Sequence, residues 1–455
     1  MKLYIGENEE ERLYLTDRDL QTHVHGVGAS RKGKSKLIEH IARDLVKEGS
    51  GFCLIDPHGE LYGNLVRWLA YIKPRREVIL FNPSYEQRIV GFNPFKLDGQ
   101  KDEARIATKV DRMVAATLRA WGATDFNQAP RLERWLRCIY HVLIEQDYSV
   151  EVARYFLSAE HVEVRNAIIQ QIRSPAIREQ LMGLVSAKTP QGYAAQLEST
   201  GNRLFKFITH PTIRRIVGLQ TNNIDLEAIT SGKGILLVNL QPSDLLSDDA
   251  ARLIGTLLLN ELWEILRRRK TGYGKKPAPF YLIIDEFQNY ATPDIPHMLD
   301  EGAKYGLHLM LLHQRLSQLS PDLHGSVKNA HTRFVFGGLP GQEVAQMLEG
   351  AQPSLTAQLN KNYDDVRAAM MHPARHFTLR QPEQPLVTAT APTVESWHVS
   401  FDRLEAYVAE KTAAYLTPEE VDAILTEQPF GEKGSAPARD GVSSIEEISD
   451  EALFE

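Results

Sequence analysis

A glycine-rich stretch near the N-terminus constrains this chain more than any other feature. It reads Gly28-Ala29-Ser30-Arg31-Lys32-Gly33-Lys34-Ser35, a glycine, four residues and then glycine-lysine-serine. A strand-like run over 23–27 precedes it, and a helix-like run over 36–48 follows. A strand, a tight loop and a helix start surround phosphates with backbone N–H groups and with the positive end of a helix dipole. This context favours a nucleoside triphosphate site over a chance match.

Each polar residue of this loop has an expected role. Lys34 reaches the β- and γ-phosphates, and the Ser35 hydroxyl holds Mg²⁺. Arg31 occupies a position where many such loops carry a second glycine, so its cation is expected beside the phosphates. The predicted nucleotide-binding residues are Gly28, Ser30, Arg31, Lys32, Gly33, Lys34, Ser35 and Lys36.

The net charge of −7 over 455 residues is unevenly distributed. The segment 430–455 holds seven acidic and two basic residues, so it carries −5 and leaves −2 for the rest. Glycine, serine and acidic residues dominate it, which predicts a disordered tail or an interaction peptide. A nearly neutral body neither excludes nucleic acid nor argues for it, because binding needs only a local basic surface.

Cellular location is indicated by what the sequence lacks. The two cysteines, Cys53 and Cys138, lie in apolar runs, and we expect two buried thiols rather than a disulfide or a metal site. No apolar run approaches the roughly 18 residues of a membrane span. The N-terminus turns acidic at once, unlike a signal peptide. We therefore expect a cytoplasmic protein.

Strands alternate with helices on both sides of a long helical segment. Alternation of this kind predicts an α/β fold, a mostly parallel sheet with helices on both faces. Residues 1–20 alternate apolar and polar around a turn, which predicts a β-hairpin. Further strands are expected at 51–55, 77–81, 234–240, 280–284, 307–312 and 333–336.

The segment of about 102–219 shows three- and four-residue apolar spacing and little strand pattern. It is too long for a loop, so we predict an inserted all-helical domain. Order is expected to weaken beyond about residue 351, apart from two amphipathic segments at 401–415 and 418–426. The predicted divisions are 1–100 and 221–390 for the two parts of the α/β domain, 101–220 for the insert, 391–429 for C-terminal helices and 430–455 for the tail.

Three polar residues stand at the ends of predicted strands and are candidates for a hydrolytic site. Asp285 and Glu286 follow the apolar run 281–284, and a phosphate-loop enzyme needs carboxylates there. Asp285 would complete the Mg²⁺ shell, and Glu286 would orient and deprotonate the attacking water. Gln314 ends the next strand, where ligands bind in open α/β sheets, but an ordinary polar strand end explains its position equally well. Lys34 and Glu286 are thus predicted catalytic residues, and Ser35 and Asp285 are the predicted Mg²⁺ ligands.

A basic cluster, 267–270 with Lys275 and Lys276, permits two interpretations. Cations at a helix C-terminus complement the helix dipole, and we favour this one. Contact with DNA phosphates is the alternative. The segment 56–60 also ends a strand, and its Pro and Gly are sufficiently explained by a turn.

The order of motifs resembles the HerA/FtsK superfamily of DNA-pumping ATPases, and most of all the TraD/TraG-type conjugative coupling proteins. The similarity covers about 20–370. It is carried by the phosphate loop, Ile55-Asp56-Pro57-His58-Gly59-Glu60-Leu61, Val90-Gly91-Phe92-Asn93-Pro94, Ile284-Asp285-Glu286-Phe287-Gln288-Asn289-Tyr290 and His313-Gln314.

The resemblance implies a RecA-like fold, ATP and Mg²⁺ as cofactors, and a hexameric ring with DNA in its pore. It also implies that Gln314 is a third catalytic residue, and that one subunit inserts a cation into its neighbour's site. Relatives often carry arginine where this chain has Ala303. The substitute candidates are Lys304, Arg315 and Arg333.

The leading hypothesis is therefore an ATP-hydrolysing ring that moves double-stranded DNA in conjugation-like transfer, DNA processing or defence. A nuclease, a relaxase or a secretion-system component is the expected partner. Arg31 and Ala303 motivate an alternative, a nucleotide-gated assembly or adaptor with low turnover. A motor for protein substrates in secretion is a third hypothesis.

Overall fold

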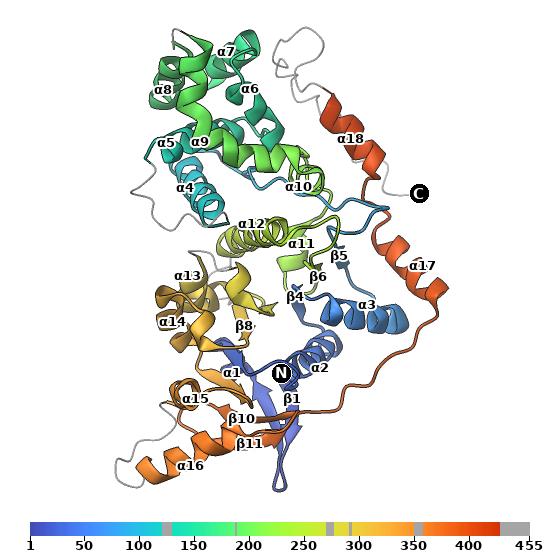
Figure 1. Cartoon of the computed structure of the whole chain (residues 1–455). Coiled ribbons are helices and arrows are strands. Elements are labelled where there is room, and N and C mark those ends of the chain that lie inside the picture. Colours follow the sequence, from blue (N-terminus) through green and yellow to red (C-terminus); the bar gives the residue numbers. More distant parts are fainter. Residues whose placement is uncertain (121–129, 187–188, 270–276, 291–293, 350–357, 428–455) are drawn as a thin grey trace, which may run out of the picture.

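One large sheet organises the protein (Figure 1). The computed structural model describes residues 1–120, 130–186, 189–269, 277–290, 294–349 and 358–427. Within them an eleven-stranded sheet has the order β2-β1-β11-β10-β9-β3-β8-β7-β4-β6-β5. The predicted α/β fold with a mostly parallel sheet is confirmed.

The seven strands from β9 to β5 in this order are parallel. Their residues are almost all buried, as expected for a sheet covered on both faces. Alternate residues of β4 point to opposite faces of the sheet. Phe52 and Leu54 pack in one apolar cluster, and Cys53 and Ile55 pack in the other. The parallel strands are β3 (Val24–Val27), β4 (Gly51–Asp56), β5 (Val78–Phe81), β6 (Ile235–Asn239), β7 (Phe280–Ile284), β8 (Leu307–His313) and β9 (Thr332–Phe336).

Helices cover the two faces of this parallel part. Helices α2 (Lys34–Lys47) and α3 (Glu60–Ile72) pack on one face through the cluster that contains Phe52. Helices α11 (Leu226–Thr230) and α12 (Asp248–Arg267) lie on the other face. The predicted cap of α12 is present, since the Ser247 hydroxyl accepts a hydrogen bond from the N–H of Ala250 at 3.3 Å.

Antiparallel strands extend the sheet beyond β9. The predicted N-terminal hairpin is β1 (Lys2–Glu7) and β2 (Arg12–Thr16), followed by α1 (Asp17–Gln21). The expectation of weak order after residue 351 is wrong for β10 (His376–Arg380) and β11 (Val387–Thr390). These short strands pair with β9, with each other and with β1. Their pairing with β9 and β1 joins segments far apart in the sequence, and such pairing leaves no local pattern.

Between β5 and α11 every regular element of the described chain is a helix, and these helices form the upper part of Figure 1. Helix α4 packs along α12, where Lys109 and Glu261 form a buried ion pair at 2.6 Å. Arg112 and Glu264 form a second pair across the same contact. The helices of this insert are α4 (Glu103–Ala120), α5 (Pro130–Glu145), η2 (Val150–Ala153), α6 (Arg154–Leu157), α7 (Val162–Gln171), α8 (Pro175–Val185), α9 (Pro190–Thr209) and α10 (Pro211–Val217).

Short helical segments connect the later strands. They are η3 (Phe287–Tyr290), α13 (Asp294–Glu301), η4 (Gly302–Tyr305), η5 (Leu316–Gln318), α14 (Pro321–Ser326), η6 (Val327–Asn329), α15 (Gly341–Leu348) and α16 (Gln358–Met370). Among the described residues no helix has the length and apolarity needed to cross a membrane. Both cysteines are buried and free, as predicted.

The C-terminal helices join the two parts of the molecule (Figure 1). Helix α17 (Phe401–Lys411) packs on α3 and β5, and α18 (Pro418–Thr426) packs on α10. Arg215 of α10 donates two hydrogen bonds to the Asp422 carboxylate, at 2.9 and 2.6 Å. The segment therefore fastens the helical insert to the edge of the sheet.

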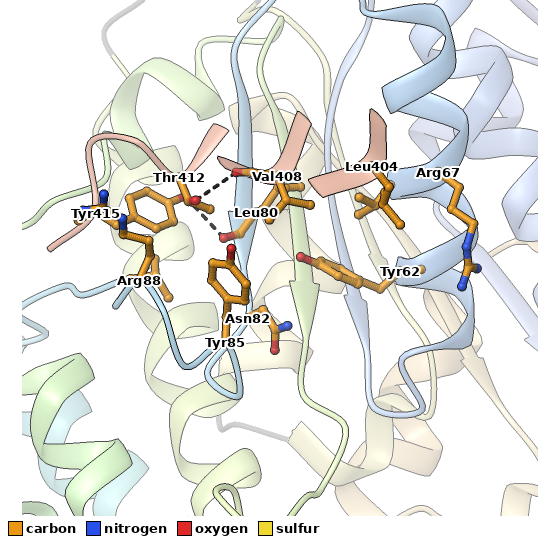
Figure 2. A pocket seen from close by; sticks show the side chains of 13 residues that line it. Tyr62, Arg67, Leu80, Asn82, Tyr85, Arg88, Leu404, Val408, Thr412 and Tyr415 are labelled. Atoms are coloured by element: carbon orange, nitrogen blue, oxygen red, sulfur yellow. Dashed lines mark hydrogen bonds between the residues drawn. The ribbon is translucent and has the colours of Figure 1, made fainter. Parts of the chain in front are cut away.

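A cavity of about 200 Å³ lies under α17 (Figure 2). Tyr62, Leu80 and Val408 line it, and Tyr415 closes one end by donating a hydrogen bond to the Leu80 carbonyl at 3.3 Å. The phosphate loop does not line this cavity, which belongs to the contact between α17 and the sheet edge.

Candidate nucleotide site

Three neighbouring parallel strands bring the predicted site residues together. Strand β8 lies between β3 and β7 and pairs with both in parallel. The carboxyl ends of the three strands therefore meet at one edge. Strand β3 leads into the phosphate loop, β8 leads into Gln314, and β7 leads into the Asp285–Glu286 pair.

The phosphate loop has the backbone that its glycines require. Gly33 has φ +107° immediately before α2, a region that favours glycine. A Cβ on Gly28 would lie 2.4 Å from the Cβ of Phe336, so only glycine fits this close approach. Arg31 has φ +61° and is exposed at the tip with Ser30.

Two predicted phosphate ligands have protein partners. The Lys32 ammonium donates to the carbonyl of His372 at 2.9 Å, which joins the loop to the turn before β10. The Lys36 ammonium lies 2.8 Å from the Glu39 carboxylate, one turn along α2. Both cations therefore stabilise the loop and its helix in this structure.

Lys34 is buried at the base of the loop, with 6% of its surface exposed. Its ammonium donates to the carbonyls of Gly28 and Ala29, the latter at 3.1 Å. Burial lowers the pKa of Lys34, and the Asp285 and Glu286 carboxylates oppose that shift. Phosphate oxygens are stronger acceptors than these carbonyls, so the ammonium is placed for an anion in the loop.

Ser35 and Asp285 form the oxygen cluster expected of a Mg²⁺ site. The Ser35 hydroxyl donates to the Asp285 carboxylate at 3.3 Å. Burial, with Glu286 and Asp56 nearby, raises the pKa of Asp285 to about 6. The Ser35 hydroxyl and the Asp285 carboxylate are hard oxygen donors of the kind Mg²⁺ prefers, and a divalent cation there would neutralise the buried carboxylate.

Asp56 has a structural task as well. Its carboxylate accepts the backbone N–H groups of His58 and Tyr62, both at 2.8 Å. It thereby caps the start of α3 while its charge contributes to the raised pKa of Asp285.

Glu286 is held in a strained and specific position. Its φ of +46° is unusual for a non-glycine residue, and such strain concentrates at functional sites. One carboxylate oxygen accepts from the Gln314 amide at 2.9 Å, and the other accepts from Gln288 at 2.8 Å. Gln288 was not among the predicted site residues, because two-residue spacing in a short helical turn carries no pattern of its own.

The three candidate cations differ in their accessibility. Arg315 is exposed, and its guanidinium has no hydrogen-bonding or ionic partner within the described chain. The Lys304 side chain is 69% exposed and lies 3.9 Å from the Glu301 carboxylate.

Arg333 is different, because it is buried. Its guanidinium donates to the backbone carbonyls of Lys328, Ala330, Gln346 and Met347. These contacts give it a structural role inside β9 and argue against it as a cation presented to a neighbouring subunit.

The arginines at the end of α12 have partners within the protein. Arg267 lies 3.6 Å from Glu264, and Arg268 lies 3.9 Å from Asp98. Arg269 donates to the Ala278 carbonyl at 2.8 Å. These contacts agree with the helix-end interpretation for the three arginines, while Lys270, Lys275 and Lys276 lie outside the described residues.

Comparison with known proteins shows which family has this fold and these motifs. The family described as type IV secretory system conjugative DNA transfer matches residues 2–331. No curated protein matches the chain. Among solved structures, the plasmid coupling protein TrwB in complex with ADP and Mg²⁺ is 14% identical, with a TM-score of 0.57 over 85% of this chain and 89% of that one.

A second similar structure is VirB4 of Thermoanaerobacter pseudethanolicus, 13% identical with a TM-score of 0.55 over 86% of this chain and 96% of that one. Identities this low establish the fold alone, and they confirm the RecA-like architecture that the resemblance implied. Because the family match spans well over half of the sequence, the chain belongs to the conjugative DNA-transfer family of type IV secretory systems, the TraD/TraG type within the HerA/FtsK superfamily.

Proposed function

We propose that this protein is a ring-forming ATPase that couples ATP hydrolysis to movement of DNA in conjugation-like transfer. The observation that carries the proposal is the meeting of Lys34, the Asp285–Glu286 pair and Gln314 at the ends of β3, β7 and β8. A TrwB structure holds ADP and Mg²⁺, which supports the same ligands here.

The residues divide the chemistry among them. Lys34 and the loop N–H groups bind and orient the phosphates. Ser35 and Asp285 would hold Mg²⁺, which supplies charge neutralisation at the β- and γ-phosphates. Glu286 accepts a proton from the attacking water, and the Gln314 amide, already bonded to Glu286, holds that carboxylate in position.

Subunit contacts complete the proposed site. We place ATP between subunits of a hexamer, with an exposed cation entering from the neighbour. Arg315 is our first choice and Lys304 the second, because both are exposed while Arg333 is committed to carbonyls. Double-stranded DNA in the central pore and a relaxase, nuclease or secretion component as partner complete the proposal.

The test measures ATP hydrolysis with and without duplex DNA, alongside particle images that count subunits. Wild-type protein should form rings and hydrolyse ATP faster with DNA. Lys34→Ala should lose about 100-fold or more in kcat. Lys47→Ala is the matched control, because Lys47 lies on the same helix, exposed and paired with Asp44. No stimulation by DNA together with full activity of Lys34→Ala would overturn the proposal.

A nucleotide-gated assembly with low turnover is the second candidate, favoured by Arg31 in the loop and by Ala303 in place of the expected arginine. Tight nucleotide binding with turnover below about one per minute would support it, since typical enzymes turn over about once per second or faster.

ATP hydrolysis stimulated by an unfolded protein and not by DNA would indicate a protein motor instead.

A further inference from the structure

A pair of buried histidines lies directly beneath the nucleotide site. His25 belongs to β3, three residues before Gly28, and His313 ends β8, immediately before Gln314. Their Nε2 atoms are 2.7 Å apart, and their exposed fractions are 1% and 0%. The two ring planes are parallel to within 3°. The contact joins two adjacent strands by a side-chain hydrogen bond, and the buried Arg333 of β9 is the register partner of His25 on its other side.

The surroundings determine which nitrogen carries each proton. The Nδ1 atom of His313 lies 2.8 Å from the carbonyl oxygen of Arg315. A carbonyl only accepts, so His313 Nδ1–H donates and its Nε2 carries a lone pair. His25 Nε2–H must then donate to His313. Burial lowers the pKa of both rings, to about 4 for His313, which keeps the pair neutral.

The pair also contacts η3, the segment that follows the third strand of the site. Phe287, directly after Glu286, packs edge-on against His25 and His313, with ring centroids 6.3 and 5.3 Å away. His25 precedes the phosphate loop, Phe287 follows Glu286, and His313 precedes Gln314. The three rings therefore form one cluster next to all three parts of the site.

The Arg315 turn is held by its backbone while its side chain is exposed. The Arg315 N–H donates to Gln318 at 2.9 Å, and the Leu316 N–H donates to Glu343 at 2.8 Å. The Arg315 carbonyl is bonded to His313. Through His313 the position of this turn depends on the strand that carries the phosphate loop.

We propose that the His25–His313 pair is a positioning device that links the phosphate loop of one subunit to Arg315, the cation it presents to the neighbouring site. The hydrogen-bond chain runs from His25 through His313 to the Arg315 carbonyl. It gives each subunit a direct connection between its own nucleotide and its neighbour's hydrolysis. This inference rests on the proposed function and adds two positioning residues to it.

The test compares variants that break the chain with one that keeps it. His25→Phe retains a ring but cannot donate, so kcat should fall about three- to tenfold, the worth of one hydrogen bond, with KM for ATP unchanged. His25→Gln offers an amide N–H to His313 and should restore most of the rate. His25→Asn, too short to reach, is a second disruptive variant in case His25→Phe does not fold. His308→Phe is the control, another buried histidine of β8 that lies away from the site edge.

Hydrogen–deuterium exchange over 314–319 distinguishes a positioning role of the pair from a merely structural one, because a structural role alone would not change its response to nucleotide. Adding Mg²⁺ and ADP should slow exchange there in wild type, His25→Gln and His308→Phe, and at least half of that response should disappear in His25→Phe. An undiminished response and an unchanged kcat in His25→Phe would overturn the inference alone. A wild-type protein that binds no nucleotide would overturn the proposed function, and this inference with it.

Discussion

At the scale of single residues, Glu286 is the most informative side chain of the site. Its backbone adopts φ +46° and its two carboxylate oxygens accept from Gln288 and Gln314. Strain of this kind costs about 1–3 kcal/mol, and a well-packed site tolerates it where geometry is required. Both oxygens are therefore oriented before any water arrives.

Glu286→Gln should remove the proposed proton acceptor while retaining the shape of the side chain. We expect kcat for ATP to fall about 10²–10⁴-fold, the usual contribution of a general base. The affinity for ADP should stay within about twofold, because Glu286 does not bind phosphate. Single-turnover hydrolysis and ADP titration measure the two effects separately. A fall of less than about threefold would exclude Glu286 as the base.

Arg31 provides a second residue-scale prediction. Its side chain is exposed at the tip of the loop and its φ is +61°. If it supplies positive charge to the phosphates of its own subunit, Arg31→Gly should lower kcat. Stability should not fall, because glycine adopts this backbone without strain. Steady-state kinetics measures the effect on kcat, and thermal unfolding measures the effect on stability. Arg31→Lys is the control that keeps the charge. An unchanged or higher kcat would refute the role.

At the scale of elements, the contact between α4 and α12 attaches the helical insert to the ATPase core. Lys109 and Glu261 are 4% and 6% exposed and lie 2.6 Å apart. Buried pairs of this kind orient two elements more than they stabilise them, since desolvation offsets the attraction.

Lys109→Met should destabilise the protein by about 3–5 kcal/mol, because it leaves the Glu261 carboxylate buried without a partner. The double variant Lys109→Met with Glu261→Met should recover most of that loss. Urea unfolding of the two single variants and the double variant completes the cycle. Additive losses in the double variant would show that the two side chains do not interact.

At the scale of the whole molecule, four buried histidines make the sheet sensitive to acid. His23, His25, His308 and His313 all lie in or beside β3 and β8. Burial lowers the pKa of each, to about 4 for His23, His308 and His313. The unfolded chain therefore takes up protons from about pH 6.5 downward while the folded protein does not.

Stability should consequently fall as pH decreases from 6.5 towards 4. Each histidine contributes up to about 1.4 kcal/mol per pH unit in this window. Asp285 acts in the opposite direction, because its pKa is raised to about 6 and its protonation relieves repulsion. Burial raises the pKa of Glu77 in the same sense, so two carboxyl groups oppose the four histidines. Urea unfolding at pH 7.5, 6 and 5, without nucleotide or Mg²⁺, measures the slope. Equal stability at pH 7.5 and 5 would contradict this account.

The sequence by itself determined the local parts of this protein. The strand–loop–helix around Lys34, the strand that ends at Asp285 and Glu286, and the alternation that predicts a parallel sheet are all contiguous patterns. Helices and strands follow such patterns because apolar spacing and caps act within a few residues. The N-terminal hairpin and the helical insert were predictable for the same reason.

Only the tertiary structure decided which distant residues meet. The bond from Gln314 to Glu286 spans 28 residues, and that from His25 to His313 spans 288. Strands β10 and β11 exist because β9 and β1 pair with them. Arg333 was a candidate for the cation presented to a neighbouring subunit, but it is buried and donates to four backbone carbonyls. No pattern in the sequence marks these contacts. Strand order, burial and the partners of a polar side chain depend on packing across the whole chain, so local spacing does not contain them.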